Sequence, residues 1–559
     1  MPNAFGHFAS IWCIVVAVET RPGERLEPIA IAAMDLAAAA VVQVGMPKLR
    51  GIRRPPYPTG PHTLILTVDA QLLAGCHLAL GWRMPDRIID LMVESRNMRA
   101  SRRVMVGGLA GALAAAGQPA TLGLASGTSP KQMRRQLDAA IRLFAGIREG
   151  FDLGRSLLRG RYLCAVACIE AAGVPIDSEL IDRLSKDWAG LLERIVATVD
   201  KSFRIYRGLS LDARAFSEML DRLGIDWPRT ATGRLSLDDA TFREMSRSHP
   251  ALSPLKELRS TLIGFDPCAL AIGRDGRNRV PLRPFSSSTG RNQPSAKASV
   301  LGSAAWVRHA IQPAPGTGLA MLDWQQQEFG IAAALSADGA MQAAYLSGDP
   351  YMALAVAARA APAGSTGASY ATVRERFKRC ALGLQYGQGP TSLARQFGTT
   401  ESVASAMIDR HKSAFSKFWS WADGIEARAW IEREVLSVFG WRLPIDATSK
   451  PRSIRNFPMQ ANGAEMMRLA CCMMTEAGIT VCAPNHDAVM IEAPVSRFDE
   501  TVAECQRLMA EASGIVLDGF ALRTTVRTVQ APHRWNDCRG TIIWSAVKTA
   551  IAGSTCSSA

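Results

Sequence analysis

The sequence lacks the features that mark several common classes of protein. None of its 12 cysteines is separated from another by two residues, the spacing typical of zinc sites, and they do not form a compact disulfide framework. We interpret them as small apolar residues in a reducing cytoplasm. The apolar segment 11–18 is too short to cross a membrane, and the apolar segment 29–46 is interrupted by Asp35. We therefore expect neither a signal peptide nor a membrane span.

Acidic residues are scarce relative to basic ones. The 559 residues include 50 Asp and Glu against 64 Lys and Arg, which gives a formal net charge of +14. Such an excess is typical of proteins that bind a polyanion, either nucleic acid or a membrane surface. Apolar residues make up 48% and charged residues 20%, as in ordinary globular proteins, and the length predicts about two to four domains.

Two short segments place carboxylates at the ends of apolar runs. In MLDWQQQEFG (321–330), Asp323 follows an expected strand and Glu328 comes five residues later. In APNHDAVMIE (483–492), Asp487 lies at an expected tight turn between two strands. Solvated loops would hold such acids equally well. If a sheet brings Asp323 and Asp487 together, two Mg²⁺ ions would relieve their repulsion and support an in-line phosphoryl displacement.

A basic amphipathic segment, VRERFKRCALGLQYGQG (373–389), lies between these acids. Four of its residues are spaced by four and would form one stripe on a helix: Arg374, Lys378, Leu382 and Tyr386. The stripe would suit a nucleotide, with phosphates at the cationic end and sugar or base near the tyrosine. A solvated basic face has the same spacing. Gly383 and Gly387 favour the binding alternative, because glycine weakens a helix but permits close approach.

The order of these three blocks resembles family A DNA polymerases, the polymerase I type. The family's palm motif Asp-Tyr-Ser-Gln-Ile-Glu-Leu-Arg resembles residues 323–330, and its last motif, His-Asp-Glu, resembles residues 486–488. Its fingers motif Arg-x3-Lys-x3-Phe-Gly-x2-Tyr-Gly resembles residues 374–387 with every spacing kept. STGRN (288–292) and RSIRNFPMQANGAE (452–465) resemble the family's segments that contact primer and template.

The resemblance implies template-directed DNA synthesis in replication or repair by a monomeric enzyme. Deoxynucleotides would be added to a primer 3′-hydroxyl with release of pyrophosphate. Asp323, Asp487 and Lys378 would be catalytic, and the two aspartates would hold two Mg²⁺ ions. The residues expected to bind the dNTP are Arg374, Lys378, Leu382, Tyr386 and Glu328, the last as a steric gate against ribonucleotides. Those expected to contact primer–template DNA are Arg291, Gln326, Arg452, Asn456, Gln460 and His486.

Three positions depart from the family pattern. Leu382 replaces an aromatic residue, Ala488 replaces an acid, and Gly330 replaces an arginine. We expect weakened rather than absent activity from the change at Ala488. The alternative is a catalytically weakened relative that binds primer–template DNA without extending it. A single-subunit RNA polymerase or reverse transcriptase is disfavoured by Glu328.

The expected fold is an α+β multidomain protein with a right-hand polymerase fold over residues 156–559. An incomplete, RNase H-like α/β domain is expected before it at 1–155, similar to a 3′–5′ exonuclease through CHLALGWRMPDRIIDL. That domain lacks the Asp-x-Glu and Tyr-x3-Asp patterns of such nucleases. We therefore expect it to be inactive and to begin after the strand that carries the first pair. The other expectations are a thumb near 185–265, fingers over 351–439, a palm from 280–350 and 440–535, and one long amphipathic helix at 177–203.

Overall fold

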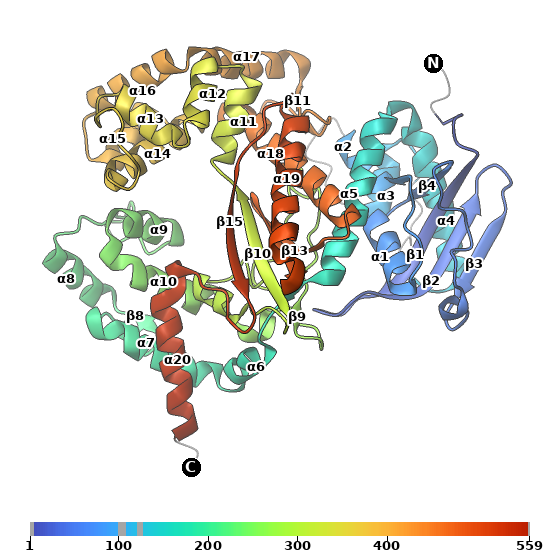
Figure 1. Cartoon of the computed structure of the whole chain (residues 1–559), viewed down its shortest axis with the longest axis horizontal. Coiled ribbons are helices and arrows are strands. Elements are labelled where there is room, and N and C mark those ends of the chain that lie inside the picture. The colour runs from blue at the N-terminus through green and yellow to red at the C-terminus, as the bar shows by residue number, and fades with distance from the viewer. Residues whose placement is uncertain (1–4, 99–107, 120–126, 557–559) are drawn as a thin grey trace.

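The computed structural model describes residues 5–98, 108–119 and 127–556. An N-terminal α/β domain lies on one side of the molecule, and a central four-stranded sheet with two helical regions makes up the rest (Figure 1). The α+β class expected from the sequence is confirmed. Among the described residues, no helix is long and apolar enough to cross a membrane.

The N-terminal domain is built on a five-stranded sheet with the order β3-β2-β1-β4-β5. Strands β1, β2 and β3 are antiparallel, whereas β4 and β5 run parallel to β1. Alternation along β1 buries Cys13 and Val15 against one helical layer and Ile14 against the other. The elements are β1 (Ser10–Glu19), β2 (Glu27–Asp35), β3 (Val41–Gly45), β4 (Thr63–Thr67), β5 (Ile88–Asp90), α1 (Ala70–Leu80), α2 (Leu91–Asn97), α3 (Gly108–Ala115), α4 (Pro130–Ile147) and α5 (Leu153–Ala172).

Strand β1 occupies the centre of this sheet, with hydrogen-bonded partners on both sides. That the domain is truncated and lacks a strand of the nuclease fold stays a prediction. Two acids of the domain cap helices: Asp69 accepts from the backbone N–H of Leu72 at the start of α1, and Asp90 accepts from that of Val93 at the start of α2. That the domain is inactive as a nuclease stays a prediction.

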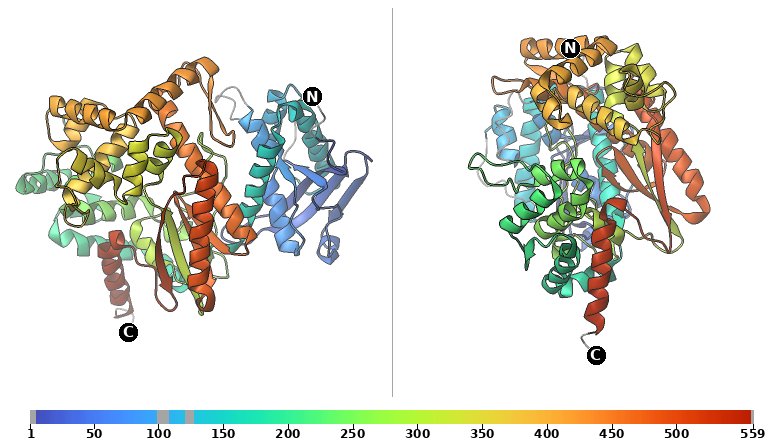
Figure 2. Two further views of the ribbon diagram at one scale, coloured as in Figure 1. Left: turned by 45° about the horizontal axis from the view of Figure 1, so that its top comes forward. Right: turned by 90° about the vertical axis from the view of Figure 1, so that its left-hand side faces the viewer.

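The thumb region is helical, as expected, but its first helix is divided. Asp187 ends α6 and begins α7, with φ −143° and its carboxylate accepting a hydrogen bond from the N–H of Gly190. The single helix expected over 177–203 is therefore two. The C-terminal helix α20 packs against α7 (Figure 2). The thumb elements are α6 (Ser178–Lys186), α7 (Trp188–Val199), α8 (Ala213–Leu223), α9 (Asp239–Ser248), α10 (Ser253–Gly264), α20 (Thr541–Cys556), β7 (Tyr206–Arg207) and β8 (Ser210–Leu211).

The central sheet is antiparallel with the order β13-β14-β10-β15. One face packs on the two long helices α18 and α19 and buries Leu322 and Ile491, while the other buries Leu319 and Met490 against the thumb core. This sheet is the palm. Its elements are β10 (Thr317–Trp324), β13 (Thr480–Asn485), β14 (Ala488–Pro494), β15 (Thr524–Gln530), α11 (Gln327–Leu335), α18 (Pro451–Glu476) and α19 (Phe498–Val516), with the two-stranded β6 (Val174–Pro175) and β9 (Arg277–Asn278) nearby.

The fingers region is a layer of short helices above the palm sheet (Figure 1). It ends in a small hairpin, whose turn at 437–441 reaches back toward the N-terminal domain. The elements are α12 (Gly339–Leu346), α13 (Pro350–Ala357), α14 (Ala371–Gln385), α15 (Pro390–Phe397), α16 (Glu401–Ala414), α17 (Ser416–Glu432), β11 (Glu434–Leu436) and β12 (Arg442–Pro444).

A buried ion pair connects α2 to α5 within the N-terminal domain. The guanidinium of Arg159 donates from Nε and Nη2 to the carboxylate of Glu94, both at 2.6 Å, and the two side chains are 7% and 1% exposed.

We predict that Arg159→Ala lowers the free energy of unfolding by about 3–5 kcal/mol, because it leaves a buried carboxylate without its partner. Arg134→Ala, which removes an exposed pair with Asp138, should cost less than about 1 kcal/mol. Equal losses in chemical denaturation would contradict this.

Candidate active site

The palm sheet brings the two sequence-predicted aspartates together. Asp323 lies on β10 opposite Ala488 of β14, and Asp487 directly precedes Ala488 in the turn of the β13–β14 hairpin. The backbone N–H of Trp324 donates to the carbonyl oxygen of Asp487 at 3.3 Å. The neighbouring His486 is exposed and adopts a left-handed backbone, with φ 59°, to make the turn. Strand register, rather than a loop, therefore sets the spacing of the two acids.

The two acids also affect one another electrostatically. Burial and the negative charge of Asp487 together raise the pKa of Asp323 to about 6, while Lys378 on α14 opposes the shift. Among the described residues, neither carboxylate has an ion-pair partner within 4 Å. The site is thus an excess of negative charge that faces one lysine.

The donor set fits a magnesium ion held jointly with substrate. Asp323 and Asp487 offer carboxylate oxygens, the donors that Mg²⁺ prefers, and protein sites for Mg²⁺ commonly supply one or two carboxylates while substrate phosphates and water complete the shell. In the described part of the chain, no group of three or more His, Cys, Asp or Glu residues could hold a metal alone. A cation bound here would therefore take its remaining oxygen ligands from substrate or water.

Helix α14 carries the predicted basic stripe along one side. Its opposite side buries Cys380, Ala381 and Leu384, while the stripe residues are only partly buried: Arg374, Lys378, Leu382 and Tyr386. Tyr386 lies just beyond the last helical residue as its C-cap. The helix and its two-sided character were expected from the sequence.

The contacts of α14 add one residue to the site. A Cβ at Gly383 would lie 1.9 Å from Oε1 of Gln388, the end of a flexible side chain that can move, so close approach of a ligand at this glycine stays a prediction. The guanidinium of Arg374 forms an ion pair with Asp349 and lies 5.6 Å from the ring centre of Tyr351. Sequence reasoning missed Asp349, whose only local signal is its place before Pro350 as a helix cap.

Glu328 lies in the first turn of α11, next to the aspartates. Burial raises its pKa, and Arg291 opposes this through an ion pair with Nη2 and Oε1 3.4 Å apart. Asp487 acts on the same carboxyl group and raises its pKa further, which places Glu328 within the site. The sequence indicated both Glu328 and Arg291 but not their pairing. A contact between Glu328 and Tyr386 stays a prediction.

The three glutamines of the 321–330 segment have separate surroundings. Gln325 bonds the backbone of β15, and Gln327 is buried against Gly463 of α18. Gln326 begins α11 with φ 44°, and its Oε1 is buried with no hydrogen-bond partner in the described part of the chain. An unpaired buried amide oxygen is costly, which favours a contact between Gln326 and a ligand, and its role with nucleic acid stays a prediction.

Helix α18 presents the other predicted nucleic-acid contacts. Arg452, Asn456 and Gln460 are spaced by four near its start and so share one face. Arg452 is exposed, the other two are partly buried, and Oδ1 of Asn456 lacks a partner among the described residues. These features favour binding of a polar ligand along this face.

The raised pKa of Asp323 predicts a dependence of stability on pH. Between the usual carboxyl value near 4 and about 6, the folded chain binds more protons than the unfolded chain, so stability falls as pH rises through this window. Without divalent metal, Asp323→Asn should raise the unfolding midpoint at pH 8 by about 2–4 °C, allowing for solvent screening, and change nothing at pH 4. Asp499→Asn, an exposed control, should be neutral at both pH values. If Asp323→Asn raised the unfolding midpoint as much at pH 4 as at pH 8, the raised pKa of Asp323 would not be its cause.

Comparisons with known proteins agree with this geometry. Residues 293–535 match the model of DNA polymerase family A. The chain is 26% identical over 386 residues to the DNA polymerase of Mycobacterium phage D29, covering 66% of this chain and 62% of the phage protein. It is 24% identical over 378 residues to the thermostable DNA polymerase I of Thermus thermophilus, covering 62% of this chain and 44% of that protein.

The fold has a counterpart among solved structures. The polymerase domain of Pol1 from M. smegmatis, solved in complex with DNA primer-template and dNTP, superposes with a TM-score of 0.71 at 16% identity, covering 94% of this chain and 96% of that one. The right-hand arrangement of palm, fingers and thumb is thereby confirmed. Over residues 293–535 this chain is therefore similar to DNA polymerase family A, and the polymerase relatives and the shared fold agree with that match.

Proposed function

We propose that this chain catalyses template-directed addition of deoxynucleotides to a primer 3′-hydroxyl. The observation that carries the proposal is the pairing of Asp323 and Asp487 at the palm sheet with Lys378 opposite them. The chain matches only 62% of the length of its phage relative, so its own activity, substrates and partners belong to this proposal. The solved counterpart holds DNA primer-template and dNTP, which supports the same ligands here.

Each side chain at the site has a role set by its charge and position. Asp323 and Asp487 would hold divalent metal, in the proposal two Mg²⁺ ions, which when bound would activate the primer hydroxyl and stabilise the departing pyrophosphate. Lys378 neutralises the nucleotide's phosphates and donates a proton to the leaving pyrophosphate oxygen. Arg374 binds the triphosphate, and to do so it exchanges the carboxylate of Asp349 for a phosphate oxygen.

The DNA contacts follow from the same geometry. Arg291, whose ion pair with Glu328 places it at the site, would contact the minor groove of the primer duplex. Among the residues that the structure describes, the amide oxygens of Gln326 and Asn456 lack protein partners, and the exposed His486 lies in the same turn as Asp487. Arg452 and Gln460 extend the surface along α18. Phosphate contacts of this basic chain would bind any sequence and weaken with salt.

Substitution of the paired aspartates tests the catalytic assignment. We predict that Asp323→Ala and Asp487→Ala each lower the rate of primer extension at least about a thousandfold, because several kcal/mol of transition-state stabilisation is lost at about 1.4 kcal/mol per tenfold. Binding of primer–template DNA should change little. The measurement is extension of a labelled primer with Mg²⁺ and dNTPs, beside Asp499→Ala as an exposed control.

The same assay separates the enzyme from a non-catalytic DNA-binding relative. Ala488 is the observation that favours the latter, since it replaces an acid and lies directly opposite Asp323. Tight binding of the duplex by the unmodified chain with no extension would establish that alternative. Extension that survives Asp323→Ala would rule out the paired aspartates as the catalytic centre.

Glu328 is proposed to exclude ribonucleotides by occupying the space of a 2′-hydroxyl. Glu328→Ala should reduce the preference for dNTPs over NTPs, measured as a ratio of kcat/KM values, by about 10- to 200-fold. Glu328→Gln is the matched control, because it keeps the volume and removes the charge that pairs with Arg291. If Glu328→Gln loses the preference for dNTPs over NTPs as fully as Glu328→Ala, the ion pair with Arg291 rather than the side-chain volume selects the sugar.

A further inference from the structure

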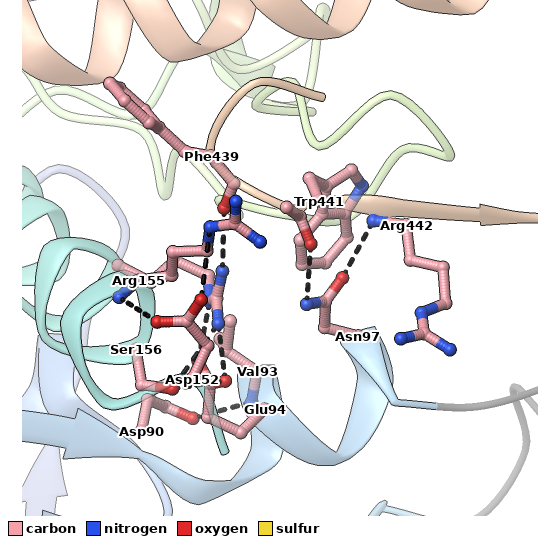
Figure 3. A network of polar contacts seen from close by, with 12 residues as sticks. Asp90, Val93, Glu94, Asn97, Asp152, Arg155, Ser156, Phe439, Trp441 and Arg442 are labelled. Atoms are coloured by element: carbon pink, nitrogen blue, oxygen red, sulfur yellow. Dashed lines mark hydrogen bonds and ion pairs between the residues drawn. The ribbon is translucent and has the colours of Figure 1, made fainter. Parts of the chain in front are cut away.

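The N-terminal domain contacts the fingers hairpin through the last turn of α2. The side-chain amide of Asn97 makes two hydrogen bonds to hairpin backbone: Nδ2 donates to the carbonyl of Gly440 at 3.0 Å, and Oδ1 accepts from the N–H of Arg442 at 2.8 Å (Figure 3). One side chain thus satisfies a donor and an acceptor at the turn. The contact joins residues more than three hundred positions apart in the chain.

A buried network of hydrogen bonds between α2, α5 and the hairpin turn lies next to the Asn97 contact. Ser156 and Arg159 of α5 both donate to Glu94 of α2, and Nη1 of Arg159 also donates to the carbonyl of Phe439 at 3.4 Å. Gly440 has φ +75°, and a Cβ there would lie 2.8 Å from Nη1 of Arg155. The turn is therefore fixed both by its backbone conformation and by its neighbours.

The hairpin turn in turn contacts the STGRN loop (288–292). Nε1 of Trp441, whose side chain is buried, donates to the carbonyl of Ser288 at 3.1 Å. A Cβ at Gly290 would lie 3.1 Å from the Trp441 ring, so loop and indole are in direct contact. The guanidinium of Arg468 donates to the carbonyl of Gly290 at 2.8 Å. The backbone immediately before Arg291 therefore contacts both Trp441 and Arg468.

Helix α2 also contacts the chain leading into that loop directly. Nη1 of Arg96 donates to the carbonyl of Phe285 at 2.9 Å. The Phe285 ring lies 5.1 Å from the Trp441 ring, centre to centre, and 4.9 Å from the guanidinium carbon of Arg468. The adjacent residues Arg96 and Asn97 therefore form hydrogen bonds to both segments that contact the STGRN loop. These are the chain at Phe285 and the hairpin turn at 437–441.

We propose that Asn97 and Arg96 are positioning residues for Arg291, so that the N-terminal domain contributes to primer-duplex binding without any chemistry of its own. The contacts run from α2 through Trp441 to the STGRN loop, and Arg291 extends from that loop to Glu328. The inference rests on the DNA contact proposed above for Arg291.

The test is a double-mutant cycle on duplex affinity and extension kinetics of the full chain. Asn97→Ala should weaken binding of a primer–template duplex by about three- to tenfold, the effect of one or two hydrogen bonds that misplace one cation. Trp441→Phe, which keeps the ring and removes the bond to Ser288, should do the same. Arg83→Ala, at an exposed residue paired with Asp86 in the same domain, should change nothing.

The cycle distinguishes positioning from general stability. Asn97→Ala should add no loss of affinity in an Arg291→Ala background, whereas an effect through folding would be additive. Additive losses of affinity in the double mutant would overturn this inference but not the proposed role of Arg291. So would full affinity for both Asn97→Ala and Trp441→Phe while Arg291→Ala binds weakly. If Arg291→Ala itself binds normally, the proposed role of Arg291 fails and the inference with it. Absence of extension by the unmodified chain would refute the proposed catalysis, and duplex affinity would still decide the positioning role.

Discussion

The repulsion between Asp323 and Asp487 is the constraint on which the rest of the site depends. Antiparallel pairing of β10 with β14 holds the two carboxylates together, and burial adds to the cost of charging both. The sheet that imposes this arrangement is buried on both faces, by α18 and α19 on one and by the thumb core on the other. The stability of those two cores therefore maintains a charge arrangement that is unfavourable by itself.

Most of the basic side chains around the two aspartates form ion pairs with other carboxylates. Arg374 is paired with Asp349 and Arg291 with Glu328, while Lys378 acts on Asp323. Such pairs keep long basic side chains oriented before an anionic ligand arrives, at the cost of breaking or sharing each pair when it binds. The site is thus close to neutral at its rim and negative at its centre, which favours a ligand that brings both phosphate and metal.

The sequence predicted the parts of the site that depend on local pattern. Apolar runs placed Asp323 at the end of a strand and Asp487 in the turn of a hairpin, and spacing by four placed Lys378 on a helix. It did not predict β1 as the central strand, because strand order is decided by long-range pairing. Asp187 divides what reads as one amphipathic helix, since two helices in tandem keep the same periodicity. The pairing of Arg374 with Asp349 and of Asn97 with Gly440 has no local signal.

The position of α20 has a consequence for how the molecule is made. The thumb core combines Ile195 of α7 and Leu255 of α10 with Ile543 and Val547 of α20, from the far end of the chain. During synthesis the early thumb helices emerge long before the helix that completes their core. Because contacts between distant segments form slowly, those helices must wait with apolar surface exposed. The thumb, although near the start of the polymerase region, would be the last part of this protein to finish folding.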